Sequence, residues 1–164
     1  QMKDLLDKIG SYNIFNYLFP GCIFAIAASK TTEFNLIQPD IISGAFVYYF
    51  LGSAVSRIGS LIIEPLLKKI GFISFAEYED FIKASKNDAL IEKLSESNNM
   101  YRTICSVLFC LALLNGVELA ASECPAIKHW LPHAAIFSLF SLYLYSYKKQ
   151  TDFINKRVQS SKNG

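Results

Sequence analysis

Four polar side chains stand inside or beside otherwise apolar stretches of this chain: Arg57, Glu64, Asn115 and Glu118. An ionisable group is costly within a membrane and usually marks an ion or substrate pathway. Arg57 and Glu64 are seven residues apart, so a regular helix would place both on one face. These residues therefore predict the wall of an ion conduit, with Arg57 at its cytoplasmic end. One alternative is that Arg57 pairs with Glu64 of a neighbouring copy, and another is that Arg57 only snorkels to the lipid headgroups.

No catalytic signature accompanies these residues. The chain contains no phosphate-binding loop, dinucleotide fingerprint or serine-nucleophile elbow. Ribonuclease chemistry of the HEPN type needs an arginine followed closely by a histidine, but Arg102 lies far before His129. Arg57 and Arg157 have no histidine close behind them either. We therefore expect no enzyme activity and no cofactor.

A loose metal-like spacing links Cys124, His129 and His133, with Glu123 as a possible fourth ligand. A zinc site needs three or four converging ligands, and prolines constrain the expected loop. We expect two loop histidines near a membrane surface and no metal. The four cysteines do not form a disulfide framework and are expected to be free: Cys22, Cys105, Cys110 and Cys124.

Four charge-free apolar stretches carry most of the hydrophobicity. Mean hydropathy is +0.27 and charged residues make up 18% of the chain, against about 25% in a globular domain. A helix needs about 20 residues to cross a bilayer. The alternative is a soluble bundle with buried core helices. We expect an all-α membrane protein with four transmembrane helices, in the stretches Ile9–Ser29, Ile41–Ser56, Thr103–Val117 and Trp130–Tyr147.

The basic residues orient this arrangement. With the N-terminus inside, 14 of the 16 Lys and Arg residues lie on the inner side, and only Lys30 and Lys128 lie outside. Basic residues resist translocation, so both termini are expected in the cytoplasm. The net charge of +2 is too small for a nucleic-acid surface, and we expect no direct binding of nucleic acid.

Rows of small residues predict close helix packing. Gly52, Ser56 and Ser60 recur every four residues, as do Gly21 and Ala25. Such rows let helices approach closely in lipid. The contacts could lie within one chain or between copies. Four short spans enclose no aqueous path, so a conduit would be shared among copies.

The chain divides into four regions. Residues 1–72 hold an amphipathic lead-in over 2–12 and spans one and two, with an expected kink at Pro20 and a helix from Asp40 to Ile70 capped by Gly71. Residues 73–100 predict a cytoplasmic hairpin of two amphipathic helices. Residues 101–148 hold spans three and four, and 149–164 form a basic tail.

The block SRIGSLIIEPLLKKIGFISFAEYEDFIKASKNDALIEKLSESNNMYRT, residues 56–103, together with the overall layout, resembles the membrane accessory proteins of type VI-B CRISPR systems. The resemblance implies a ring of identical subunits, about eight in a closed assembly, in the bacterial inner membrane. Such a pore would depolarise the cell when the RNA-guided CRISPR ribonuclease detects phage transcripts. The lipid bilayer, further copies of the chain and, functionally, that ribonuclease are the implied partners.

Two functions follow as expectations. The first is a homo-oligomeric inner-membrane pore that acts as an anti-phage effector. The second is a non-conducting membrane adaptor whose cytoplasmic hairpin binds or regulates a partner protein. A membrane-bound enzyme is a weaker third. The ring and the adaptor differ in stoichiometry, so the mass of the detergent-solubilised particle separates them.

Topology gives the first prediction. In a cysteine-free background, a cysteine placed at Thr32 or Ala126 should react with a reagent outside intact spheroplasts, because these positions are expected outside. A cysteine at Ser85 or Ser160 should react only after lysis. External labelling at Ser85 contradicts the four-span arrangement.

Overall fold

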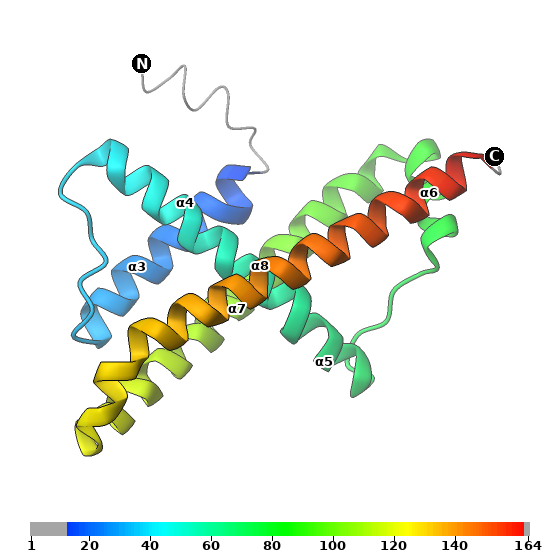
Figure 1. The fold of residues 1–164 in the computed structure, drawn as a ribbon. Coiled ribbons are helices and arrows are strands. Elements are labelled where there is room, and N and C mark those ends of the chain that lie inside the picture. Colours follow the sequence, from blue (N-terminus) through cyan, green and yellow to red (C-terminus); the bar gives the residue numbers. More distant parts are fainter. Residues whose placement is uncertain (1–12, 163–164) are drawn as a thin grey trace.

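The computed structural model describes residues 13–162, and every regular element within that range is a helix. The all-α class is therefore confirmed for the described residues, while the lead-in expected over residues 2–12 lies outside them. Figure 1 shows the helices in chain order: η1 (Ile14–Leu18), α3 (Phe19–Thr31), α4 (Ile41–Ile58), η2 (Gly59–Ile63), α5 (Glu64–Lys69), α6 (Tyr78–Asn87), α7 (Ala89–Glu123) and α8 (Pro125–Lys162).

Two prolines shape the first two long helices. The elements η1 and η2 are π-helical turns, and each ends two residues before a proline, Pro20 or Pro65. Proline has no N–H and its ring crowds the carbonyl four residues earlier. Widening the turn to an i→i+5 bond relieves that crowding. The helix from Ile41 to Lys69 therefore continues through Pro65, as expected.

The ends of this second helix are capped by side chain and backbone. Asp40 accepts a hydrogen bond from the Ser43 N–H at 2.7 Å, which is the N-cap arrangement. At the other end, Gly71 has a φ of 74°. Its N–H donates to the Lys68 carbonyl and the Phe72 N–H donates to the Leu67 carbonyl. These two bonds form a Schellman motif, so the predicted glycine cap is confirmed.

The predicted cytoplasmic hairpin needs a correction. Its first helix exists as α6, but its second is not separate, because α7 runs unbroken from Ala89 to Glu123. Asp88 caps this helix by accepting from the Leu90 N–H at 2.8 Å. The polar stretch from Ala89 to Arg102 contains no proline or glycine, so the helix continues into the apolar stretch that begins at Thr103. The hairpin helix and the third expected span are therefore one 35-residue helix.

The loop expected between the third and fourth stretches is also shorter than predicted. Only Cys124, in an extended conformation, separates α7 from α8. A residue before proline is pushed out of the helical region, and proline is favoured at the first helical position. His129 and His133 therefore lie on α8 and not in a loop. The basic tail is helical as well, since α8 extends to Lys162.

A close crossing joins the first two helices. A Cβ atom on Gly21 would overlap the carbonyl oxygen of Tyr48, and one on Gly52 would overlap that of Tyr17. Only glycine permits backbones to approach this closely. Ala25, one turn after Gly21, is fully buried. These small residues therefore pack within the chain, which settles the choice that the sequence left open for Gly21 and Gly52.

Two helices among the described residues are long and apolar enough to cross a bilayer, Ile41–Lys69 and Ala89–Glu123. The sequence predicted four. The first expected span begins outside the described residues, and its described part is the continuous helix formed by η1 and α3, in which the polar residues Asn16 and Tyr17 interrupt the apolar sequence. The fourth lies in α8, where tyrosines and His133 dilute its apolar residues. These findings are compatible with a membrane protein, and the four-span topology stays a prediction.

The glycine crossing gives the second prediction. Gly52→Ala should lower the free energy of unfolding in detergent by about 1–3 kcal/mol, because the added methyl group forces the two backbones apart. Gly116→Ala is the matched control, since its Cβ would meet nothing within 4 Å. That helical substitution should be neutral or stabilise by up to about 1 kcal/mol. Equal unfolding temperatures for Gly52→Ala and the parent protein would contradict the crossing.

Candidate functional site

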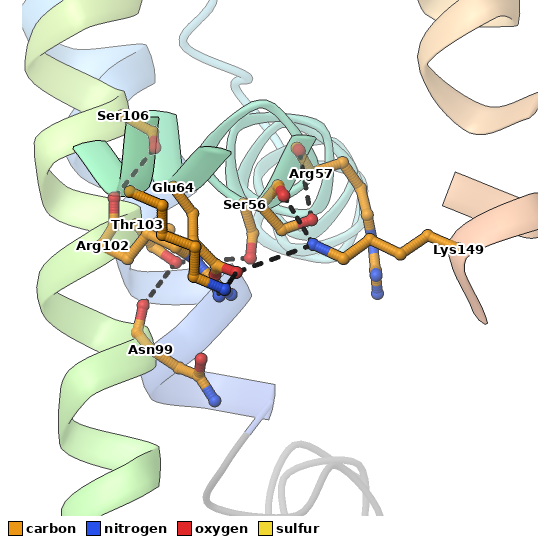
Figure 2. A network of polar contacts seen from close by, with 10 residues as sticks. Ser56, Arg57, Glu64, Asn99, Arg102, Thr103, Ser106 and Lys149 are labelled. Atoms are coloured by element: carbon orange, nitrogen blue, oxygen red, sulfur yellow. Dashed lines mark hydrogen bonds and ion pairs between the residues drawn. The ribbon is translucent and has the colours of Figure 1, made fainter. Parts of the chain in front are cut away.

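Glu64 is the centre of a charged network that joins three helices. Its Oε2 atom lies 2.6 Å from Nη1 of Arg102 on α7, and its Oε1 atom lies 3.2 Å from Nζ of Lys68. Lys149 on α8 places its Nζ atom 4.0 Å from the same Oε1. The Glu64 side chain is only 13% exposed. We call Glu64, Lys68, Arg102 and Lys149 the Glu64 network. Figure 2 shows Glu64 with Arg102 and Lys149.

The π-turn explains why Lys149 reaches this site. The Glu64 N–H donates to the Gly59 carbonyl instead of the Ser60 carbonyl. The next amide along belongs to Pro65 and has no hydrogen. The Ser60 carbonyl is thus left without a donor from its own helix. Lys149 Nζ donates to that oxygen at 2.6 Å, which satisfies a buried backbone acceptor with a charged donor.

Small hydroxyl residues let α7 approach the second helix beside the network. Thr103 is fully buried. Its hydroxyl donates to the Asn99 carbonyl at 2.9 Å, and its oxygen lies 3.3 Å from Ser56 Oγ. Ser106 is also fully buried, and a Cβ atom on Gly59 would overlap its hydroxyl. These contacts fix the position of α7 along the second helix, so that Arg102 lies opposite Glu64. Figure 2 shows Ser106, Thr103 and Asn99 one after another along α7.

Arg57 and Glu64 are not paired with each other. Arg57 Nη2 donates to the hydroxyl of Tyr17 at 3.3 Å, while Glu64 faces Arg102. The π-turn η2 lies between them and adds a residue to that turn of the helix. The seven-residue spacing therefore no longer places the two side chains on one face. The two side chains thus have different partners within the chain, and their place in the wall of a conduit stays a prediction.

Asn115 and Glu118 belong to a different place on α7. Arg102 and Glu118 are about 24 Å apart along the helix axis at the usual rise per residue. Asn115 Nδ2 donates to Thr31 Oγ1 at 3.2 Å, and Glu118 Oε1 accepts from the Glu33 N–H at 2.6 Å. These two residues therefore hold the loop after α3, and the four candidates form two separate sites.

The row Gly52, Ser56 and Ser60 is divided among three partners. Gly52 meets the first helix, Ser56 meets Thr103 of α7, and the Ser60 carbonyl meets Lys149 of α8. All three residues are buried within the chain. This row accordingly organises the packing of one subunit.

Sequence reasoning missed Tyr17, Arg102 and Lys149 as site residues. Arg102 and Lys149 are basic residues that directly flank the ends of expected spans three and four. Their position could have indicated a contact with Glu64. In the expected topology the ends of these spans and Glu64 lie on the same side of the membrane, at a similar depth. Tyr17 carried no comparable signal, since it reaches Arg57 only through the Gly21–Gly52 crossing.

No group of three or more metal-ligating side chains lies among the described residues. His129 and His133 have ring centroids 6.2 Å apart, with Trp130 beside both. The four cysteines are free. No protein-family model, curated protein or solved structure matches this chain.

The Glu64 network gives the third prediction. Glu64→Gln should destabilise the protein in detergent by roughly 1.5–3 kcal/mol, the range for a hydrogen bond to a charged group. Glu33→Gln is the control, because it removes the exposed ion pair with Lys128, which contributes less than about 1 kcal/mol.

A double-mutant cycle with Arg102→Gln separates the pair from its surroundings. The double variant should lose less stability than the sum of the single losses. Strict additivity would mean that Glu64 and Arg102 do not interact.

Proposed function

We propose that this chain is a four-span inner-membrane protein, with both termini in the cytoplasm, whose copies assemble into a pore that depolarises the membrane. The observation that carries the proposal is the exposure of its apolar helices. Only 17% of the most apolar window of α7 and 33% of that of the second helix are buried. A core helix of a soluble protein would be mostly buried.

Large apolar side chains on α7 and α8 face outward, among them Leu113, Leu119, Ile136, Phe137 and Phe140. A soluble monomer rarely exposes contiguous apolar surface on this scale. Lipid or neighbouring copies would cover it. The first candidate helix starts at Ile41, well inside the chain, which argues against a signal sequence.

A conduit, in this proposal, lies between copies. Within one subunit the buried polar groups are used for internal contacts, as in the Glu64 network. Arg57 lies near the same end of the second helix, and its guanidinium would contribute to the field at a shared opening. The resemblance to type VI-B accessory proteins supplies the biological setting, in which the pore strengthens RNA-guided defence against phage.

A non-conducting adaptor is the second candidate, favoured by the end of the molecule formed by α6, α7 and α8. Tyr78 of α6 packs edge-on against Phe153 of α8, with ring centroids 5.1 Å apart. An open groove of about 480 Å³ runs between these helices, lined by Phe81, Ile82, Glu92, Asn99 and Arg157 among others. A partner protein could be bound at such a helical head.

Reconstitution distinguishes the two functions and gives the fourth prediction. Purified protein should run as a particle several times the 18.4 kDa subunit mass, beyond its bound detergent. In proteoliposomes it should collapse an imposed potassium diffusion potential, read by a voltage-sensitive dye. A monomer or dimer that leaves the potential intact would support the adaptor and reject the pore.

Variants of Arg57 test its role in that pore. Arg57→Ala should change the ratio of cation to anion permeability, because it removes a charge at the opening. Arg57→Lys should keep that ratio, and Tyr17→Phe removes the hydrogen bond but keeps the charge. If Arg57→Ala alters neither permeability nor particle mass, the residue only snorkels to lipid.

A further inference from the structure

An apolar groove lies on the surface where the second helix meets α8. It has a volume of about 520 Å³ and is open to the outside. Leu61 and Ile62 of η2 form one wall. The other wall comes from α8, with the residues Phe137, Ser138, Ser141, Leu142 and Tyr145.

The groove leads to the Glu64 network along both walls. On α8, the groove residues Ser138, Leu142 and Tyr145 share a helix face with Lys149, at spacings of four, three and four. Lys149 is about 10 Å beyond Leu142 along the axis. On the other wall, Leu61 and Ile62 stand between Ser60 and Glu64. The apolar groove and the charged network are therefore neighbours along both helices.

The charges at this end are unbalanced. The described residues bring the cationic side chains of Lys68, Arg102 and Lys149 to one carboxylate, that of Glu64. Arg57 pairs elsewhere but lies close enough to Lys149 to repel its charge. Burial lowers the pKa of Lys149, Glu64 opposes that shift, and repulsion from the other three cations lowers the pKa further. Repulsion among the cations indicates that the site lacks negative charge.

Two of these cations are also accessible. The Lys149 and Lys68 side chains are 44% and 45% exposed. Arg102 Nε is buried and has no hydrogen-bond partner among the described residues. An anionic oxygen placed beside Lys149 and Lys68 would compensate the excess charge without displacing Glu64 from Arg102.

We infer that this groove and the neighbouring cations bind one anionic phospholipid, with its phosphodiester at Lys149 and Lys68 and an acyl chain in the groove between η2 and α8. The inference rests on the four-span topology of the proposed function, because that topology places the groove within the hydrocarbon and Lys149 at the cytoplasmic headgroups. Basic pockets between membrane helices bind anionic headgroups in this way. Going from the membrane interior toward the cytoplasm in this topology, the apolar groove comes before the cations, just as the acyl chain of a phospholipid comes before its headgroup.

Native mass spectrometry of the full chain can test this. The protein is extracted, equilibrated with equal amounts of phosphatidylglycerol and phosphatidylcholine, and the bound lipids are counted. The parent protein should retain phosphatidylglycerol preferentially. Lys149→Gln should reduce that preference about fivefold, the factor that corresponds to about 1 kcal/mol for one basic residue. Lys156→Gln is the matched control, since it removes the same charge from an exposed position on α8.

Further variants locate the two parts of the lipid. Lys149→Arg should restore the preference, and Lys68→Gln should lower it without touching the bond to the Ser60 carbonyl. Ser141→Phe should fill the groove and reduce retention of both lipids. An equal loss for Lys156→Gln and Lys149→Gln would overturn the inference, because it would indicate general attraction to anionic lipid.

Inorganic phosphate tests the alternative ligand. If millimolar phosphate displaces phosphatidylglycerol while Ser141→Phe has no effect, the site takes a free anion and the lipid assignment is wrong. A protein that inserts in membranes but shows no lipid preference overturns only this inference. A protein that washes off membranes at high pH overturns the proposed function as well.

Discussion

A single missing N–H, that of Pro65, governs much of this molecule. When a long helix continues through a proline, one backbone carbonyl in the preceding turn lacks its helical N–H donor and needs a hydrogen bond from another group. The π-turn η2 moves the deficit to the Ser60 carbonyl, and Lys149 supplies the donor. Because Lys149 is on α8, its hydrogen bond to the Ser60 carbonyl connects α8 to the second helix. The same turn rotates Glu64 toward Arg102 on α7, so one backbone defect specifies where three helices meet.

The opposite half of the second helix uses a different constraint. At the Gly21–Gly52 crossing the backbones themselves are in contact, and no side chain could be exchanged for either glycine without separating the helices. The hydrophobic cluster around Phe24, Val55 and Val107 is small. In such a subunit, close backbone packing and polar ties carry a larger share of specificity than apolar burial does. This explains why small hydroxyl residues such as Thr103 and Ser106, and not large aliphatic ones, are among the most buried.

Local signals in the sequence predicted the parts of the fold that depend on few residues. The N-terminal start at Asp40, the Gly71 cap and the continuous helix between them follow from nearest neighbours. The prediction of a separate second hairpin helix was wrong. Its apolar residues have the spacing of an amphipathic helix, but no helix-ending residue precedes Thr103, so the helix continues into the apolar stretch. The pairing of Glu64 could not be predicted from a period of 3.6 residues, since the π-turn changes that period locally. The distant partner Tyr17 depended on a crossing whose geometry only the folded chain defines.

The division of polar groups between the two ends of the bundle bears on how a conduit could arise. Glu118 and Asn115 hold the loop after α3, while Glu64 holds α7 and α8. Each group thus has a partner within its own subunit, and removing one partner would leave the other charge poorly compensated. A pore lined by these same groups would require them to exchange partners during assembly. A pore lined instead by hydroxyl and apolar side chains, with Arg57 near its mouth, requires no such exchange. For the proposed pore, the internal pairing therefore favours a weakly charged wall, with the field concentrated near Arg57.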